Sequence, residues 1–214
     1  MIAIFDWDGT LCDSIDHIVE AMQDTAEELA LEPPGVMAVR DIVGLGLPQA
    51  IHRLFPALDD AQCAEAAAAY SRHFVAPGRA PARLFDGALE TLESLRERGI
   101  ELAVATGQSR RGLDRVLGAL GLDNFFDVTR CADETRSKPH PMMLHEIMAV
   151  RSKSAPEVVV IGDSEYDLDM AQQAGVRSVG VSFGVHDNQR LSAFGPLGIV
   201  DDLPALLAMD VFTP

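Results

Sequence analysis

The stretch IAIFDWDGT, residues 2–10, joins a short apolar run to two aspartates and a glycine. The run from Ile2 to Phe5 predicts a buried strand, and the Asp-Gly that follows predicts a tight turn. Similar apolar runs recur along the chain, at residues 101–105, 128–131, 158–161 and 178–181. Helical patterns separate these runs. Strands that alternate with helices indicate an α/β fold class, a doubly wound parallel sheet covered on both faces.

Leucines spaced three residues apart mark one of these helices, over residues 88–98, and it ends before Gly99. Similar patterns predict helices around residues 113–120, 141–150 and 168–174. The tail, residues 201–214, predicts a short closing helix followed by a frayed end. In a parallel sheet of this kind, ligands bind beyond the carboxyl ends of the strands.

Residues 14–80 interrupt the alternation of strands and helices. Apolar positions at helical spacing predict a helix over 15–29, and further helical segments follow at 48–55 and 61–75. We therefore expect an all-helical insertion over 14–80, and a catalytic core formed by residues 1–13 and 81–214.

The composition narrows the choice of partners. The chain has 214 residues and a formal net charge of −16, which repels nucleic acid and anionic membranes. Its first residues carry no signal-peptide pattern, and no apolar stretch approaches the roughly 20 residues of a membrane span. The three cysteines are too far apart for a zinc site or a disulfide framework. We expect a cytoplasmic protein, a monomer or weak homodimer, with neither a nucleic acid nor a membrane partner.

Four aspartates follow two of the predicted strands. Asp6 and Asp8 come directly after the first strand, and Asp163 and Asp167 come after the run at 158–161. Each could be an ordinary turn or helix-capping residue. If the two strands are neighbours, however, these like charges converge at one edge of the sheet, which is costly unless a cation lies among them. Carboxylate oxygens are the ligands that Mg²⁺ prefers.

Two further residues suit a phosphate group. Thr106 ends another strand, where its hydroxyl and the N–H of Gly107 could bind a phosphate oxygen, although a Thr-Gly turn is the simpler explanation. Only two of the 17 basic residues are lysines, Lys138 and Lys153. A lysine at Ser137-Lys138-Pro139 in so arginine-rich a chain indicates a need for a compact ammonium group, against the alternative of a chance surface lysine.

Together these motifs stand in a particular order: Asp6-x-Asp8-Gly-Thr-Leu, then Thr106, then Lys138-Pro139, then Gly162-Asp163-x-x-x-Asp167. This order resembles the haloacid dehalogenase superfamily over nearly the whole chain. The helical insertion after the first strand resembles the cap of the phosphoglycolate phosphatase and β-phosphoglucomutase branch. The resemblance implies a Rossmann-like core with a helical cap.

The resemblance also implies a Mg²⁺-dependent phosphatase. Asp6 would be the nucleophile that forms an aspartyl-phosphate, and Asp8 would act as general acid and then general base. Asp6, Asp163 and the backbone carbonyl of Asp8 would bind Mg²⁺. Asp167 would support the metal site or orient Lys138.

The same resemblance implies a phosphate site and a specificity loop. The residues expected to hold the phosphoryl group through side chains or backbone N–H groups are Asp6, Trp7, Asp8, Thr106, Gly107 and Lys138. The loop RDIVGLGL, residues 40–47, resembles the segment that descends from the cap toward the active site. Its expected contact residues are Arg40, Gly44, Leu45, Gly46 and Leu47, with an ordinary helix connection as the alternative.

The substrate expected from the resemblance is a small phosphorylated metabolite, with 2-phosphoglycolate the first candidate. Gln108 stands where many phosphoglycolate phosphatases have asparagine. A phosphotransferase of the β-phosphoglucomutase type shares every motif and stays open. A true dehalogenase needs no acid at the position of Asp8, and a receiver domain has no place for the helical insertion. A non-catalytic binding protein with this fold is the remaining alternative.

Overall fold

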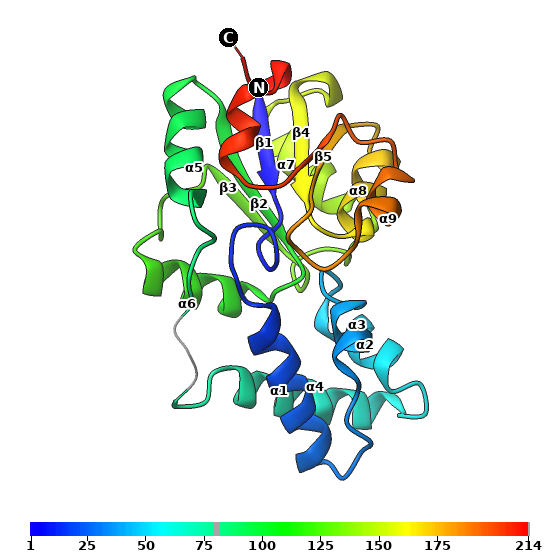
Figure 1. The fold of residues 1–214 in the computed structure, drawn as a ribbon. Helices are drawn as coiled ribbons and strands as arrows, with labels where there is room; N and C mark the ends of the chain where they lie inside the picture. Colours follow the sequence, from blue (N-terminus) through cyan, green and yellow to red (C-terminus); the bar gives the residue numbers. More distant parts are fainter. Residues whose placement is uncertain (79–81, 214) are drawn as a thin grey trace.

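The computed structural model describes residues 1–78 and 82–213 of the chain. Six parallel strands form one sheet in the order β3-β2-β1-β4-β5-β6, which confirms the predicted fold class (Figure 1). Each predicted strand is present. The sixth strand, β6, was not predicted, because two residues are too few to show the apolar pattern of a strand. The strands are β1 Ile2–Phe5, β2 Glu101–Thr106, β3 Val128–Cys131, β4 Val158–Gly162, β5 Arg177–Val181 and β6 Ile199–Val200.

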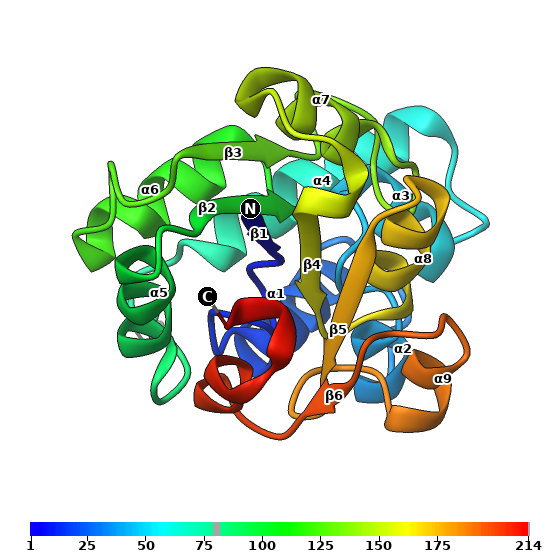
Figure 2. The ribbon, with the colours of Figure 1, turned by 90° about the horizontal axis from the view of Figure 1, so that it is seen from above.

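Helices cover both faces of the sheet. The side chains of α5 and α6 pack on one face, together with the C-terminal segment, and those of α7 and α8 pack on the other. Figure 2 shows α5 and α7 on opposite sides of the sheet. Alternate residues of β1 enter the two apolar clusters, so that the strand is buried on both faces, as its unbroken apolar sequence predicts. The helices are α5 Ala88–Glu97, α6 Arg110–Leu120, α7 Met142–Arg151, α8 Glu165–Gln173 and α9 Asn188–Ser192.

The strand order reverses direction at β1. The chain passes from β1 to β2 and β3 on one side, and continues with β4, β5 and β6 on the other. Phe5 is in register with Val104 of β2 and Ile161 of β4, so the residues that follow these strands emerge at the same edge. This edge, between β1 and β4, is the topological switch point at which such sheets bind ligands.

Of the five helices described between β1 and β2, the first four form a separate layer at the carboxyl end of the sheet (Figure 1). We call these helices the cap. Their apolar faces enclose a cluster of their own, in which α1 packs against α4. The predicted boundary at residue 80 lies outside the described residues, and the division into core and cap stays a prediction. The cap helices are α1 Ile15–Glu28, α2 Val36–Arg40, α3 Leu47–Leu54 and α4 Asp60–Phe74.

The C-terminal tail differs from its prediction. Two short 3₁₀ turns, Pro204–Ala208 and Asp210–Phe212, replace the expected single closing helix. The end is not frayed over the described residues, because the Phe212 side chain is buried against the sheet. The tail is anchored by tertiary packing, which local sequence patterns do not report. Within the described part of the chain, no helix is long and apolar enough to cross a membrane.

The connection between α2 and α3 is docked on the core. The Arg190 guanidinium of α9 lies 2.5 Å from Asp41 Oδ1, and it also pairs with Glu165 of α8. The hydroxyl of Tyr166 donates to the backbone carbonyl of Asp41 at 2.7 Å, and Arg53 of α3 donates to that hydroxyl. Polar bonds from two core helices therefore hold this cap segment in place.

Replacing Arg190 by alanine should loosen the cap and leave the sheet intact. Partly exposed ion pairs contribute up to about 1 kcal/mol each, so backbone amides of residues 36–54 should exchange roughly 5-fold faster, measured by hydrogen exchange. Amides of β1 and β4 should not change. The matched control is Arg177→Ala, which removes an exposed arginine bonded to the Pro156 carbonyl. Unchanged exchange over 36–54 would mean that Arg190 does not hold the cap.

Candidate active site

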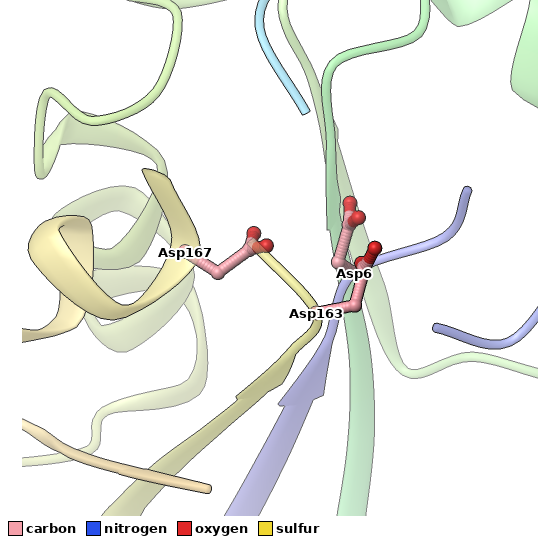
Figure 3. A group of neighbouring side chains, drawn as sticks. All are labelled: Asp6, Asp163 and Asp167. Atoms are coloured by element: carbon pink, nitrogen blue, oxygen red, sulfur yellow. The ribbon is translucent and has the colours of Figure 1, made fainter. Parts of the chain in front are cut away.

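Three buried carboxylates meet at the switch point. Asp6 follows β1, Asp163 follows β4, and Asp167 extends from the first turn of α8. An oxygen from each lies within 4.8 Å of the others. Figure 3 shows the three side chains converging beyond the ends of the two strands. The convergence expected from the sequence follows from the pairing of β1 with β4, which places Asp6 N 2.9 Å from the carbonyl of Ile161.

Lys138 is the cation within this group. Its ammonium lies 2.5 Å from Asp6 Oδ1 and 2.6 Å from Asp167 Oδ1, and its side chain is fully buried. Burial lowers the pKa of Lys138, but Asp167 and Asp6 raise it further, so the group stays charged. Burial also raises the pKa of Asp6 well above its usual range, an effect that Lys138 opposes and the other two acids reinforce. One ammonium does not balance three buried carboxylates.

Asp163 is fixed by groups on two loops. The hydroxyl of Thr10 donates to Oδ1 at 2.8 Å, and the backbone N–H of Val185 donates to Oδ2 at 2.9 Å. Both loops approach the carboxylate closely: a Cβ at Gly9 would lie 2.3 Å from Oδ2, and one at Gly184 would lie 2.1 Å from the Asp163 Cβ. Burial and the charge of neighbouring Asp167 raise the pKa of Asp163 to about 7.

The acid cluster suits a divalent cation. Its donors are carboxylate oxygens, which hard cations such as Mg²⁺ prefer to nitrogen or sulfur. Among the described residues, Asp6 Oδ2 is buried and has no hydrogen-bond partner. A bound cation would satisfy this oxygen and supply the positive charge that Lys138 alone does not. Asp6, Asp163 and Asp167 therefore fit a metal centre. Both oxygens of Asp167 also accept bonds within the protein, from Lys138 and from Ser164, which agrees with the supporting or orienting role predicted for it; that role stays a prediction.

Asp8 points to a different set of partners. Ser14 Oγ donates to its Oδ1 at 2.7 Å, and the Gln108 amide donates to both carboxylate oxygens at 2.8 Å. Burial raises the pKa of Asp8, and the two hydrogen bonds only partly oppose this shift. A carboxyl group whose pKa is raised toward neutrality can both give and take a proton. The raised pKa and the fixed orientation of Asp8 agree with the general acid–base role predicted for it, which stays a prediction.

The remaining phosphate candidates lie on the same rim but have distinct surroundings. Thr106 is buried at the end of β2, and its hydroxyl accepts the N–H of Gln108 at 3.1 Å. Trp7 is fully buried and packs edge-on against Phe126, which suits a packing role for its side chain. Gly107 faces the cap: a Cβ there would lie 2.5 Å from the backbone oxygen of Leu45.

The expected specificity loop is only partly directed toward the site. Gly44, Leu45 and Leu47 line a cavity of about 560 Å³ between cap and core, whose wall also includes Asp8. Gly46 instead donates its N–H to the Ser137 hydroxyl beside Lys138. Arg40 donates to the backbone carbonyl of Gly184, 2.8 Å away. Arg40 therefore binds the loop that fixes Asp163, and the specificity role of all five residues stays a prediction.

Several residues of the site were not singled out from the sequence. Ser164 donates to Asp167 Oδ2 at 2.6 Å, and the Ser-x-x-Asp spacing of a capping box could have revealed this pair. The bonds that Ser14 and Gln108 make to Asp8 carry no such local signal. Gln108 is 100 residues from Asp8 along the chain, and only the adjacency of β1 and β2 brings the two together.

The comparisons with known proteins agree with this geometry. Residues 3–181 match the family model of haloacid dehalogenase-like hydrolases. The chain is 35% identical to the "probable phosphatase IndB" of Dickeya dadantii, over 94% of this chain and 89% of that protein. It is 30% identical to a phosphoglycolate phosphatase of Pseudomonas putida, over 96% of this chain and 78% of that protein. A crystal structure described as a haloacid dehalogenase-like hydrolase from Bacteroides fragilis superposes with a TM-score of 0.89 at 27% identity, covering 96% and 98% of the two chains.

A doubly wound sheet with buried acids at its switch point and an inserted helical layer defines a class of α/β hydrolases. This chain belongs to the haloacid dehalogenase-like hydrolase family. The predicted family and the predicted class of enzyme, a hydrolase, are confirmed.

The raised pKa of Asp163 predicts how stability depends on pH in metal-free protein. Between about pH 4 and pH 7 the folded protein retains a proton that the unfolded chain has released. The free energy of unfolding should therefore decrease as pH rises through this range, by up to roughly 1.4 kcal/mol per pH unit for this proton. Urea unfolding in EDTA at several pH values measures it.

Added Mg²⁺ should restore stability most at the upper end of this range, because the ionised carboxylates bind the cation. Asp163→Asn should remove this proton's share of the pH slope and leave the shares of Asp6 and Asp8, whose pKa values are also raised, whereas the control Asp123→Asn, at an exposed acid, should keep the full slope. A stability that rises with pH in EDTA would show that the buried acids are not protonated in the folded state.

Proposed function

We propose that the protein is a Mg²⁺-dependent phosphatase that hydrolyses a small phosphomonoester through an aspartyl-phosphate on Asp6. One observation carries the proposal. Lys138 binds Asp6 Oδ1 at 2.5 Å, while the other carboxylate oxygen of Asp6 is buried with no hydrogen-bond partner among the described residues. Lys138 opposes the rise in the pKa of Asp6 and so favours its ionised form, which is the form that binds a cation and attacks phosphorus.

In the first step, a carboxylate oxygen of Asp6 attacks the phosphorus of the bound ester. The bond from phosphorus to the alcohol oxygen breaks, and Asp8 gives its proton to that oxygen as it leaves. Lys138, the Thr106 hydroxyl and the N–H of Gly107 hold the oxygens of the transferring group. Phosphoryl transfer depends mainly on such positioning and charge neutralisation.

In the second step, water attacks the phosphorus of the aspartyl-phosphate and gives its proton to the Asp8 carboxylate. The bond from phosphorus to the Asp6 oxygen breaks, which restores the carboxylate and releases inorganic phosphate. Asp8 must be protonated in the first step and ionised in the second, and its raised pKa suits this alternation. The bonds from Ser14 and Gln108 keep its carboxylate oriented between the steps.

Asp6, Asp163 and the backbone carbonyl of Asp8 would hold Mg²⁺, with Asp167 completing or supporting the site. The bound cation supplies positive charge that neutralises the phosphate and draws it to Asp6 in a protein with a net charge of −16. The donor set and the unpartnered oxygen of Asp6 support this assignment.

2-Phosphoglycolate is the first substrate to test, since the Pseudomonas putida relative is a phosphoglycolate phosphatase by name. We also infer that the enzyme works in the cytoplasm on a phosphorylated metabolite. Its three cysteines are buried and unpaired, as in proteins of a reducing compartment.

A screen of purified protein against phosphorylated metabolites should reveal Mg²⁺-dependent phosphate release. Activity should disappear in excess EDTA and return with Mg²⁺, and Ca²⁺ should inhibit, because its looser coordination disturbs Asp6. Asp6→Asn, which keeps the side-chain volume, should lower turnover at least ~10⁴-fold and so exclude a contaminating phosphatase. Full turnover in EDTA would contradict the metal assignment.

Asp8→Asn should separate the two chemical steps. Without a general acid, alkyl esters should react slowly, whereas p-nitrophenyl phosphate needs less protonation of its leaving group. Rapid mixing with this aryl ester should therefore give a burst of about one nitrophenolate per enzyme, followed by little turnover, because the second step still needs a base. An equal loss for alkyl and aryl esters in single turnovers would argue against this role for Asp8.

A further inference from the structure

The cavity of about 560 Å³ between cap and core lies on the leaving-group side of the proposed reaction. Helices α1 and α4 of the cap form one wall, and the start of α6 in the core forms the other. Asp8 lines this cavity and Asp6 does not. If Asp8 protonates the leaving oxygen, the alcohol part of the substrate extends into this space. The inference below therefore rests on the proposed function.

The cap side of this cavity is mainly apolar. Aliphatic and aromatic side chains from α1, α3, α4 and the α2–α3 connection line it, and they offer surface to an apolar ligand. Phosphate or glycolate alone would leave this surface in contact with water. The residues are Ile18, Met22, Ile42, Val43, Ala50 and Phe74.

Two arginines stand on the opposite wall. Arg111 and Arg115 are four residues apart on α6, so they share one face of the helix, and both line the cavity while remaining exposed at its mouth. The Arg115 guanidinium lies 5.8 Å from the centre of the Phe74 ring on the cap. Burial, and then the like charge of Arg111, lower the pKa of Arg115.

Neither of these arginines has a carboxylate within ion-pair distance in the described part of the chain. The preceding arginine, Arg110, pairs with both Glu134 and Asp114. The other described arginines without an ion pair each hydrogen-bond to a carbonyl oxygen or a histidine, whereas Arg111 and Arg115 have neither an ion pair nor a hydrogen bond within the described residues; the others are Arg40, Arg96, Arg98, Arg136 and Arg177. Guanidinium groups bind carboxylate and phosphate groups in a fixed, bidentate geometry.

We propose that the substrate is a phosphomonoester of an amphipathic alcohol: an apolar body that fills the cap side of the cavity, and a second anionic group that binds Arg111 and Arg115. Gln108 contacts Asp8, and the two arginines follow three and seven residues later. An anion bound between the two arginines lies one to two helical turns, roughly 5–10 Å, from Gln108 at the Asp8 end of the cavity. In 2-phosphoglycolate a single CH₂ group separates the ester oxygen from the carboxylate, which is too short a spacer for this arrangement.

A matched series of esters tests the proposal. ω-Carboxyalkyl phosphates with one to seven CH₂ groups, of which 2-phosphoglycolate is the first member, are compared with neutral alkyl phosphates of equal length. We expect kcat/KM to rise at least ~10-fold from the first member to spacers of four to seven CH₂ groups. It should also exceed kcat/KM of the neutral ester, meaning the alkyl phosphate of equal length that carries no charge besides its phosphate. A maximum at 2-phosphoglycolate, or no preference for the carboxylate, would overturn the proposal.

Variants assign the preference to the arginines. The double substitution Arg111→Gln with Arg115→Gln should reduce the ratio of kcat/KM between carboxylated and neutral esters at least ~10-fold, mainly through KM, because charge-assisted bonds are lost. Arg177→Gln removes a positive charge at the start of β5, the opposite end of the sheet, and should leave the ratio unchanged. An equal change in both variants would mean that net charge, and not the cavity, sets the preference.

A binding measurement separates failure of this inference from failure of the proposed function. ω-Carboxyalkyl and neutral alkyl phosphonates, which are not hydrolysed, are titrated into Mg²⁺-loaded protein by calorimetry. Tighter binding of the carboxylated compounds, lost in the double variant, supports the inference even if no ester is hydrolysed. Equal binding of the two series overturns it even if phosphatase activity is found.

Discussion

The acid cluster at the carboxyl end of the sheet depends on the charge balance around Lys138. Three carboxylates are buried together at the edge between β1 and β4, and a single ammonium contacts two of them, Asp6 and Asp167. Removing one partner from such a buried group leaves an uncompensated charge, at a cost of roughly 3–5 kcal/mol. The remaining deficit of positive charge is one that the proposed divalent cation would fill.

Much of the surrounding structure serves to hold this group in place. Gly9 and Gly184 let two loops approach Asp163 at distances that any side chain would prevent. Arg40 of the cap binds the carbonyl of Gly184, so the loop that fixes Asp163 is also one on which the cap rests. On the other side, Gly107 allows the backbone of the cap to approach the end of β2. The acid cluster and the cap are therefore linked by contacts to the backbone of Gly184 on one side and of Gly107 on the other.

In the proposed reaction, the cap separates recognition of the substrate from phosphoryl transfer. Residues on the sheet edge would provide the charges that this transfer needs, whatever alcohol leaves. The cavity beyond Asp8 is built from apolar cap helices and from the face of α6 that carries Arg111 and Arg115. Under this proposal, changes in the cavity would alter which alcohol is recognised and leave the acid cluster untouched.

The sequence by itself determined the alternation of strands and helices and the family. It also predicted that four acids would converge, and three of them, Asp6, Asp163 and Asp167, form the buried cluster. Apolar runs and caps act over a few residues, so local patterns report them, as the bounds of β1 and α5 show. Only the tertiary structure decided which partners each acid has: that Gln108 and Ser14 bind Asp8, that Arg40 turns toward Gly184, and that Phe212 is buried. Except for the bond between Ser14 and Asp8, those contacts join residues far apart in the chain. They depend on strand order and packing, which local sequence patterns do not report.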